Sequence, residues 1–370
     1  MSFRLARIAA VSAMTAILLT GCARFDDSTT SPFEPPPTQA LGGEVGPGTP
    51  TTTSKAPRPT GPCIDPDEAV VVSCLDTTGG IVVLPDAGSA LVTERRTGRI
   101  LQVTADRKPV EVAKLNVDAT GDGGLTDIAL SPHYDEDKLI YAYVTTGSDN
   151  RIVRLAPGDE PKPILVGIPK GPDGNAGAID FAPNGDLIVL TGDSGSPAAA
   201  ADPNSRAGKV LRITDPQTTG ASPSSILMSG VGRAGGLCPD PQGNIWVTDR
   251  TETEDRLSKV TSDGTVLNSV WTWPDKPGVA GCAAAADAIV VSLEFAKALA
   301  VVRVEASTGT VSTAPSIALQ QRYGALHGAA TGPDGLIWIT TANKTSGTPG
   351  PFDDRVIRIP PQSPAGGGSD

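Results

Sequence analysis

The feature that most constrains the fold is a repeated unit, a hairpin followed by one more strand, that occurs six times along the chain. The three clearest copies are IDFAPNGDLIVLTGD (179–193), LCPDPQGNIWVTDR (237–250) and AATGPDGLIWITTAN (329–343). In each copy a strand of small and apolar residues leads through a Pro-x-Gly turn into an alternating strand. Asn-Gly and Asp-Gly pairs are typical of tight hairpin turns. The repeat therefore predicts a series of β-hairpins.

Three weaker copies fill the gaps: IVVLPDAGSALVTER, IALSPHYDEDKLIYAYVTT and AAAADAIVVSLEF. The six first strands are centred near Leu84, Ile128, Ile179, Leu237, Ala283 and Ala329. Their spacing equals or somewhat exceeds the roughly 40–50 residues of a four-stranded propeller blade. A β-helix or two sandwiches would not produce six such units. The sequence predicts an all-β fold, a six-bladed β-propeller.

Composition agrees with this fold and excludes one class of partner. The chain has 42 Gly and 34 Pro residues, which suits short strands joined by turns and argues against a helical bundle. Aromatic residues are only 4% of the chain, so Val, Ile, Leu and Ala must fill the core. The formal net charge is -11, which gives no attraction for a phosphate backbone. We expect no nucleic-acid partner.

The N-terminus has the pattern of an exported lipoprotein. Arg4 and Arg7 precede an apolar run, residues 8–20, that is too short to span a bilayer comfortably. The run ends in Leu-Thr-Gly-Cys at Cys22, which resembles a bacterial lipobox; the alternative is an ordinary secretory signal with a chance cysteine. We expect residues 1–21 to be a signal peptide and Cys22 to carry acyl chains. The partner is then the membrane, and the location is the extracytoplasmic face of the plasma membrane.

The segments that flank the repeats are not expected to fold. Residues 22–62 are mostly Thr, Pro, Ser and Gly, which predicts a disordered linker after the lipidated cysteine. The predicted propeller covers residues 63–360, and residues 361–370 form a flexible tail.

Four cysteines besides Cys22 suggest two disulfides in an oxidising compartment. Cys238 and Cys282 occupy equivalent positions on the first strands of neighbouring blades, where inner strands converge. We therefore favour the pairs Cys63–Cys74 and Cys238–Cys282, although four cysteines allow three connectivities.

Two adjacent blades resemble the glucose/sorbosone dehydrogenase family, soluble quinoproteins that oxidise sugars with pyrroloquinoline quinone (PQQ). The segments GDGGLTDIALSPHYDEDKLIYAYVTT (121–146), GPDGNAGAIDFAPNGDLIVLTGD (171–193) and SRAGKVLRI (205–213) carry the resemblance. With the lipobox and linker, the whole chain resembles lipoproteins of the mycobacterial envelope. The family resemblance implies a histidine base that opens a His-x-Gly-Gly phrase, a neighbouring arginine and a calcium ion. Here the phrase begins at Gly174, which has no side chain.

The second family motif, Gly-His-Arg-Asn-x-Gln-Gly-Leu, is also altered. Residues 230–237 read GVGRAGGL, so Val231 replaces the histidine and Gly232 the arginine. A shift of one residue would let Arg233 supply the positive charge. The paired acids Glu254 and Asp255 remain near the position of the family's calcium loop, and the sequence leaves metal binding open.

These departures predict a degenerate, non-catalytic propeller that binds a carbohydrate or an envelope protein and needs no cofactor. Polar residues at strand starts and in blade-connecting loops are expected to form its pocket: Asp127, Asp173, Asn175, Asp193, Arg233, Asp249, His327 and Asn343. The alternative is a PQQ- and calcium-dependent sugar or aldehyde dehydrogenase with a rearranged site. A calcium-dependent lactonase is a further alternative, for which the Gly and Ala residues at the strand starts leave few ligands.

Overall fold

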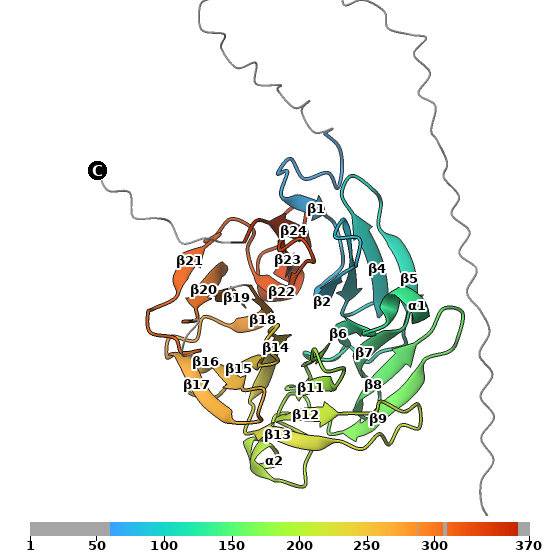
Figure 1. Cartoon of the computed structure of the whole chain (residues 1–370). Helices are drawn as coiled ribbons and strands as arrows, with labels where there is room; N and C mark the ends of the chain where they lie inside the picture. Colours follow the sequence, from blue (N-terminus) through green and yellow to red (C-terminus); the bar gives the residue numbers. More distant parts are fainter. Residues whose placement is uncertain (1–59, 286, 306–308, 362–370) are drawn as a thin grey trace, which may run out of the picture. The chain divides into compact units, whose positions relative to one another are not determined.

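The computed structural model describes residues 60–285, 287–305 and 309–361. These residues form six four-stranded antiparallel sheets around a central channel (Figure 1). The predicted six-bladed β-propeller is thereby confirmed. The expected signal peptide, Cys22, the expected linker up to residue 59 and residues 362–370 of the expected tail lie outside the described residues.

Five blades are built from four consecutive strands each, which run from the channel to the rim. Blade 1 contains β2 (Thr78–Val83), β3 (Ser89–Glu94), β4 (Arg99–Thr104) and β5 (Val110–Lys114). Blade 2 contains β6 (Leu125–Leu130), β7 (Ile140–Thr145), β8 (Asn150–Leu155) and β9 (Lys162–Ile168). Blade 3 contains β10 (Gly177–Phe181), β11 (Leu187–Thr191), β12 (Lys209–Ile213) and β13 (Ser225–Ser229). Blade 4 contains β14 (Arg233–Pro239), β15 (Ile245–Arg250), β16 (Asp255–Val260) and β17 (Val266–Trp273). Blade 5 contains β18 (Val279–Ala284), β19 (Ala288–Leu293), β20 (Ala298–Arg303) and β21 (Ser316–Ala318).

Blade 6 joins the two ends of the described chain. Its inner strands are β22 (Leu326–Thr331), β23 (Ile337–Thr341) and β24 (Val356–Ile359), and its outermost strand is β1 (Val70–Val72). Val70 pairs with Ile357, so the N-terminal strand completes the last sheet and closes the ring. A disulfide joins Cys63 to Cys74 on either side of β1, with a Cα–Cα distance of 5.4 Å.

Within residues 60–361 as described, three short helices lie in loops between strands: α1 (Tyr134–Asp137), α2 (Pro197–Ala201) and α3 (Asn343–Ser346). Among the residues that the structure describes, no helix has the length and apolarity to cross a membrane.

The core lies between blades. Each hydrophobic cluster combines residues of two neighbouring blades; that of blades 2 and 3, for example, contains Tyr141, Ile179 and Leu187. The second strand of a blade packs against both neighbouring blades, one on each face of the sheet. Every residue of β7 and β19 is therefore buried. Burying both faces of these strands supplies the main stabilising energy of the fold.

The inner strands approach one another through small residues. A Cβ added at Gly236 would lie 2.6 Å from the Cα of Gly281 in the next blade. Beside this contact Cys238 forms a disulfide with Cys282, with a Cα–Cα distance of 5.7 Å. Both expected disulfide pairs are therefore confirmed.

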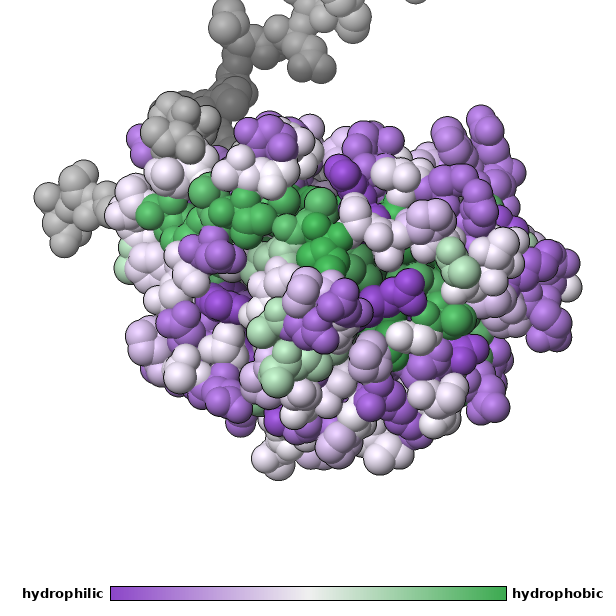
Figure 2. Space-filling view, turned by 90° about the horizontal axis from the view of Figure 1, so that it is seen from below, coloured by the Kyte–Doolittle hydropathy of each residue, from purple (hydrophilic) through white to green (hydrophobic). Residues whose placement is uncertain are grey.

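The rim of the propeller carries both apolar and polar surface (Figure 2). Its outermost strands expose single apolar side chains, such as Ile226 on β13 and Leu267 on β17. An exposed aromatic ring, Phe295, lies instead beside the central channel.

Candidate functional site

The central channel forms a cavity of about 600 Å³ whose wall is made by the inner strands of all six blades. Charged side chains gather where the inner strands begin, the end that we call the channel mouth. They come from loops before β6 and β10, from strand starts, and from the ends of β3, β15 and β19. These residues are Arg95, Asp122, Asp173, Arg233, Arg250, Glu294 and His327.

At the mouth, Gly174 occupies the position of the family base, and its surroundings leave no room for a side chain. Its φ is +68°, in the left-handed region that favours glycine. An added Cβ would lie 2.4 Å from Oδ1 of Asp193 and 2.7 Å from the backbone nitrogen of Gly195. The backbone N–H of Gly174 donates a 2.9 Å hydrogen bond to Asp122. The loop is thus built around a glycine and could not hold an imidazole without rearrangement.

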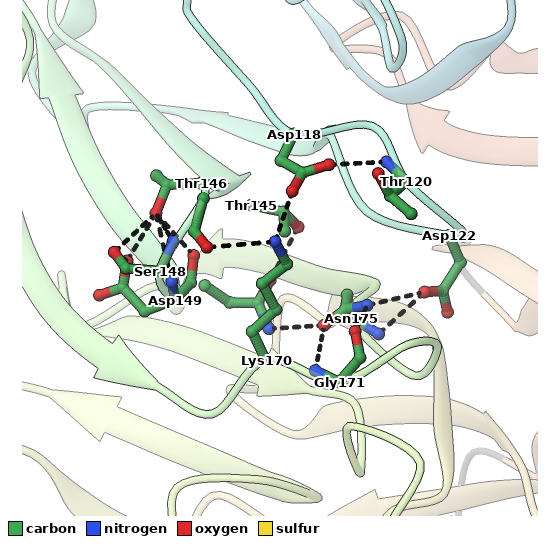
Figure 3. A network of polar contacts seen from close by, with 12 residues as sticks. Asp118, Thr120, Asp122, Thr145, Thr146, Ser148, Asp149, Lys170, Gly171 and Asn175 are labelled. Atoms are coloured by element: carbon green, nitrogen blue, oxygen red, sulfur yellow. Dashed lines mark hydrogen bonds and ion pairs between the residues drawn. The ribbon is translucent and has the colours of Figure 1, made fainter.

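A polar network holds this loop in place (Figure 3). Asp122 also accepts a hydrogen bond from the backbone N–H of Asn175, at 3.0 Å. The Asn175 side chain exchanges hydrogen bonds with the backbone of Gly171, at 2.9 and 2.8 Å. Lys170 donates to Asp118 at 2.5 Å, which ties the loop before β10 to the loop before β6. These hydrogen bonds fix the backbone conformation of the loop that contains Gly174.

The second altered motif places its arginine against a carboxylate. Arg233, at the start of β14, forms an ion pair with Asp173, and both side chains are partly exposed. Gly232 donates its N–H to Asp249 at 2.9 Å, and a Cβ there would lie 2.2 Å from the Arg250 carbonyl oxygen. No side chain can therefore occupy position 232 in the present backbone.

A cluster of side chains from three blades forms another part of the mouth. Arg250 Nη1 lies 3.1 Å from Oε2 of Glu294, and His327 Nδ1 lies 3.8 Å from Oε1, within ion-pair distance but beyond a hydrogen bond. Burial alone would raise the pKa of Glu294, but His327, Arg250 and Ser346 outweigh burial and lower this pKa to about 2. The cluster therefore holds a carboxylate that stays charged.

Deeper in the channel, two carboxyl groups lie in an apolar wall. Asp127 on β6 accepts hydrogen bonds from the backbone of Ile128 and Ile179, each 2.9 Å, yet burial raises its pKa to about 8. Burial likewise raises the pKa of Asp180 on β10 to about 7. The low-polarity surroundings favour the neutral form of both carboxyl groups, although each is partly exposed to the cavity.

Four of the eight expected pocket residues line the cavity: Asp127, Asp173, Arg233 and His327. The other four, Asn175, Asp193, Asp249 and Asn343, are buried and do not line it. Their side chains are used in holding loops, as Asn343 shows by accepting from the Ala325 backbone at 2.7 Å. Buried polar groups need such partners, and the backbone supplies them here.

Sequence analysis missed five residues of the mouth: Arg95, Asp122, Arg250, Glu294 and Phe295. Three of them stand at or just after the end of a second strand, in the phrases TERR, TDRT and SLEF. Aligning the strand ends of the six repeats would have singled out this recurring position.

The residues at the motif positions do not fit the cofactor chemistry that the family implies. The base and arginine positions are glycines in close contact with backbone or carboxylate atoms. Asp255, the candidate calcium ligand, is buried away from the cavity, and its Oδ2 accepts the N–H groups of Gly278 and Val279 at 2.6 and 3.0 Å. In the described ranges, no three His, Cys, Asp or Glu side chains are grouped so that they could hold a metal ion.

Comparison with known proteins shows which proteins this propeller is similar to. The family model for Glucose / Sorbosone dehydrogenase matches residues 75–252. Quinoprotein glucose dehydrogenase B of Acinetobacter calcoaceticus is 25% identical over 149 residues, which are 35% of this chain and 31% of that protein. The match thus spans about a third of this curated relative.

Solved structures extend the similarity over most of the chain. The PQQ-bound form of an aldose sugar dehydrogenase from Streptomyces coelicolor is 28% identical with a TM-score of 0.71, covering 79% of this chain and 96% of that one. A putative oxidoreductase (glucose dehydrogenase) from Thermus thermophilus is also 28% identical, with a TM-score of 0.69 and coverage of 78% and 98%. The PQQ domain of a Coprinopsis cinerea pyranose dehydrogenase shares the fold at 12% identity, with a TM-score of 0.55 and coverage of 78% and 94%. The described residues therefore form a propeller similar to those of the glucose and sorbosone dehydrogenases.

Proposed function

We propose that this protein is a non-catalytic binding module of the cell envelope. A lipidated Cys22 would hold it at the extracytoplasmic face of the plasma membrane, and the channel mouth would receive a carbohydrate or an envelope protein. The family scaffold supports a ligand site at the mouth, while the residues present there support binding rather than oxidation.

One observation carries this proposal: the conformation of Gly174. The family reaction needs an imidazole within hydrogen-bond reach of the sugar hydroxyl. The left-handed backbone, the close approach of Asp193 and the hydrogen bond to Asp122 all oppose a side chain at this position. Loss of a general base alone costs roughly 10²–10⁴-fold in rate.

The test is an oxidation assay on the full chain with added PQQ and calcium. Aldoses should be oxidised no faster than in a blank without protein, and titration with PQQ should leave its absorbance spectrum unchanged. A soluble glucose dehydrogenase in the same assay is the positive control. Oxidation above the blank would contradict the proposal.

The membrane location has its own test. Replacing Cys22 by Ala removes the thiol that would be acylated, so the variant should move from the membrane fraction to the soluble fraction. A variant that stays membrane-bound would rule out anchoring through this residue.

One observation favours the alternative of a dehydrogenase with a rearranged site. His327 lines the cavity, and the buried Glu294 carboxylate lies beside its Nδ1, an arrangement that can orient an imidazole. If oxidation occurs in the assay above, His327→Ala should abolish it. Activity that survives this change would exclude His327 as the base.

A further inference from the structure

The mouth has two arginines whose N–H donors are only partly used by the described residues, and we propose that this cationic side binds the carboxylate of an acidic sugar. We define the cationic side as Arg95 and Arg250, which lie near the carboxylates of Asp122 and Glu294, with the His327 imidazole beside them. The inference rests on the proposed binding function and narrows the ligand to one chemical class.

The unused donors are clearest at Arg95, which has no carboxylate of the described chain within ion-pair distance, although Asp122 and Glu294 act on its charge from farther away. Its Nη1 donates to the carbonyl oxygens of Gly121 and Gly123, at 3.2 and 2.5 Å. Those bonds fix the guanidinium and leave its Nε–Nη2 edge without a hydrogen-bond partner among the described residues. A planar edge with two parallel N–H groups matches a carboxylate better than a single hydroxyl.

The rest of the cationic side also has more donors than acceptors. Glu294 is shared by Arg250 and His327, at 3.1 and 3.8 Å. In the described part of the chain, Arg250 Nε and His327 Nδ1 are buried without a hydrogen-bond partner. A buried donor without a partner, such as Arg250 Nε, is uncommon, and an anionic group nearby would stabilise the arginine charge. Since the whole chain has a formal charge of -11, the attraction for an anion must be local.

The remainder of the mouth suits a sugar ring. Phe295 is 57% exposed and is the only aromatic residue among the strongly exposed large apolar side chains of the described ranges. It lines the cavity, with the Arg250 guanidinium 5.4 Å from its ring centre, and offers a flat apolar surface to the C–H face of a sugar. Asp122 and Asp173, also on the cavity wall, can accept hydrogen bonds from hydroxyls.

The channel is open in front of His327. The second positions of the other inner strands carry small residues, namely Gly79, Thr126, Ala178, Ala234 and Ala280. A monosaccharide can therefore enter the 600 Å³ cavity as far as the imidazole.

The test is calorimetric titration of the full chain with D-glucuronate, D-glucose and D-glucose 6-phosphate, without PQQ or calcium. Glucuronate should bind about tenfold more tightly than glucose, because charged hydrogen bonds to the arginines are added. High salt should reduce this ratio. Equal binding of the two sugars, preference for the phosphate, or no binding of any of them would overturn the inference. The PQQ oxidation assay tests the proposed function separately, so the two failures are distinguishable.

Two substitutions should change the ratio in opposite directions. Arg95→Gln removes the unpaired cation and should lower the glucuronate-to-glucose affinity ratio about tenfold. Glu294→Gln removes the competing carboxylate with little change of shape, and should raise that ratio. Arg303→Gln is the matched control, because Arg303 is an exposed arginine on β20 that does not line the cavity. If Arg95→Gln fails to fold, Glu294→Gln alone still tests the inference. An unchanged or lower glucuronate-to-glucose affinity ratio in Glu294→Gln would contradict it.

Discussion

At the scale of single residues, Gly174 sets the conformation of the loop that carries Asp173 to the mouth. Glycine is the only residue type that fits at this position. The backbone φ is +68°, and an added Cβ would lie only 2.4 Å from the Asp193 carboxylate. An imidazole at position 174 would therefore require a change of the whole loop, because the surrounding backbone and the Asp193 carboxylate occupy the space. Restoring histidine alone should not restore a base.

Substitution at this glycine tests that conclusion. Gly174→Ala should lower the free energy of unfolding by about 2–4 kcal/mol, because a left-handed backbone and a steric clash both oppose the methyl group. Gly185 is the matched control, since its φ is +86° and an added Cβ meets nothing within 4 Å. Gly185→Ala should cost only about 1 kcal/mol. Equal losses in urea denaturation would show that the Gly174 loop relaxes.

At the scale of elements, the inner strands combine close contact with buried acidity. Glycines let β14 and β18 approach and a disulfide joins them, whereas β6 and β10 carry Asp127 and Asp180 on the channel wall. Burial raises the pKa of both carboxyl groups into the neutral range. The channel wall should therefore make stability depend on pH.

The sign follows for Asp180, whose folded-state pKa of about 7 exceeds the unfolded value of about 3.9. The folded chain keeps a proton that the unfolded chain releases, so this stabilisation is complete below about pH 4 and is lost as the pH rises through about 7. Asp180→Asn needs no proton and keeps an oxygen for the Phe181 N–H, now 2.8 Å from Oδ1. The free energy of unfolding in urea, taken as Asp180→Asn minus wild type, should increase by about 1–2 kcal/mol from pH 4.5 to pH 8.

A control separates this effect from general charge removal. Asp275 is exposed, and Asp275→Asn should show no such gain. If both variants respond to pH alike, the channel environment of Asp180 is not the cause.

At the scale of the whole molecule, ring closure depends on three residues at the N-terminal edge of the propeller. β1 pairs with β24 and buries Val70 and Val71, which are 1% and 8% exposed. Without β1, blade 6 would lack its outer strand, and the edge of β24 would be open.

Truncation tests the closure. A chain that begins at residue 60 should unfold in urea at the same midpoint as the full chain. A chain that begins at residue 76 loses β1 and the Cys63–Cys74 disulfide. It should be less stable by at least about 3 kcal/mol, because two buried valines, an edge strand and a crosslink are removed. Equal midpoints for the two truncated chains would show that β1 does not hold the ring together.

The sequence by itself determined the blades, because their signals are local. Pro-x-Gly turns and alternating strands act within a few residues, and equal repeat positions were enough to pair Cys238 with Cys282. Tertiary structure alone decided the closure by β1 and the direction of the loop side chains. Val70 meets Ile357 from the far end of the chain, a pairing without a hairpin signal. The side chains of Asn175 and Asn343 bond to backbone groups, because buried donors and acceptors must be satisfied. The mouth is lined instead by other residues, among them Arg95, Arg250 and Glu294.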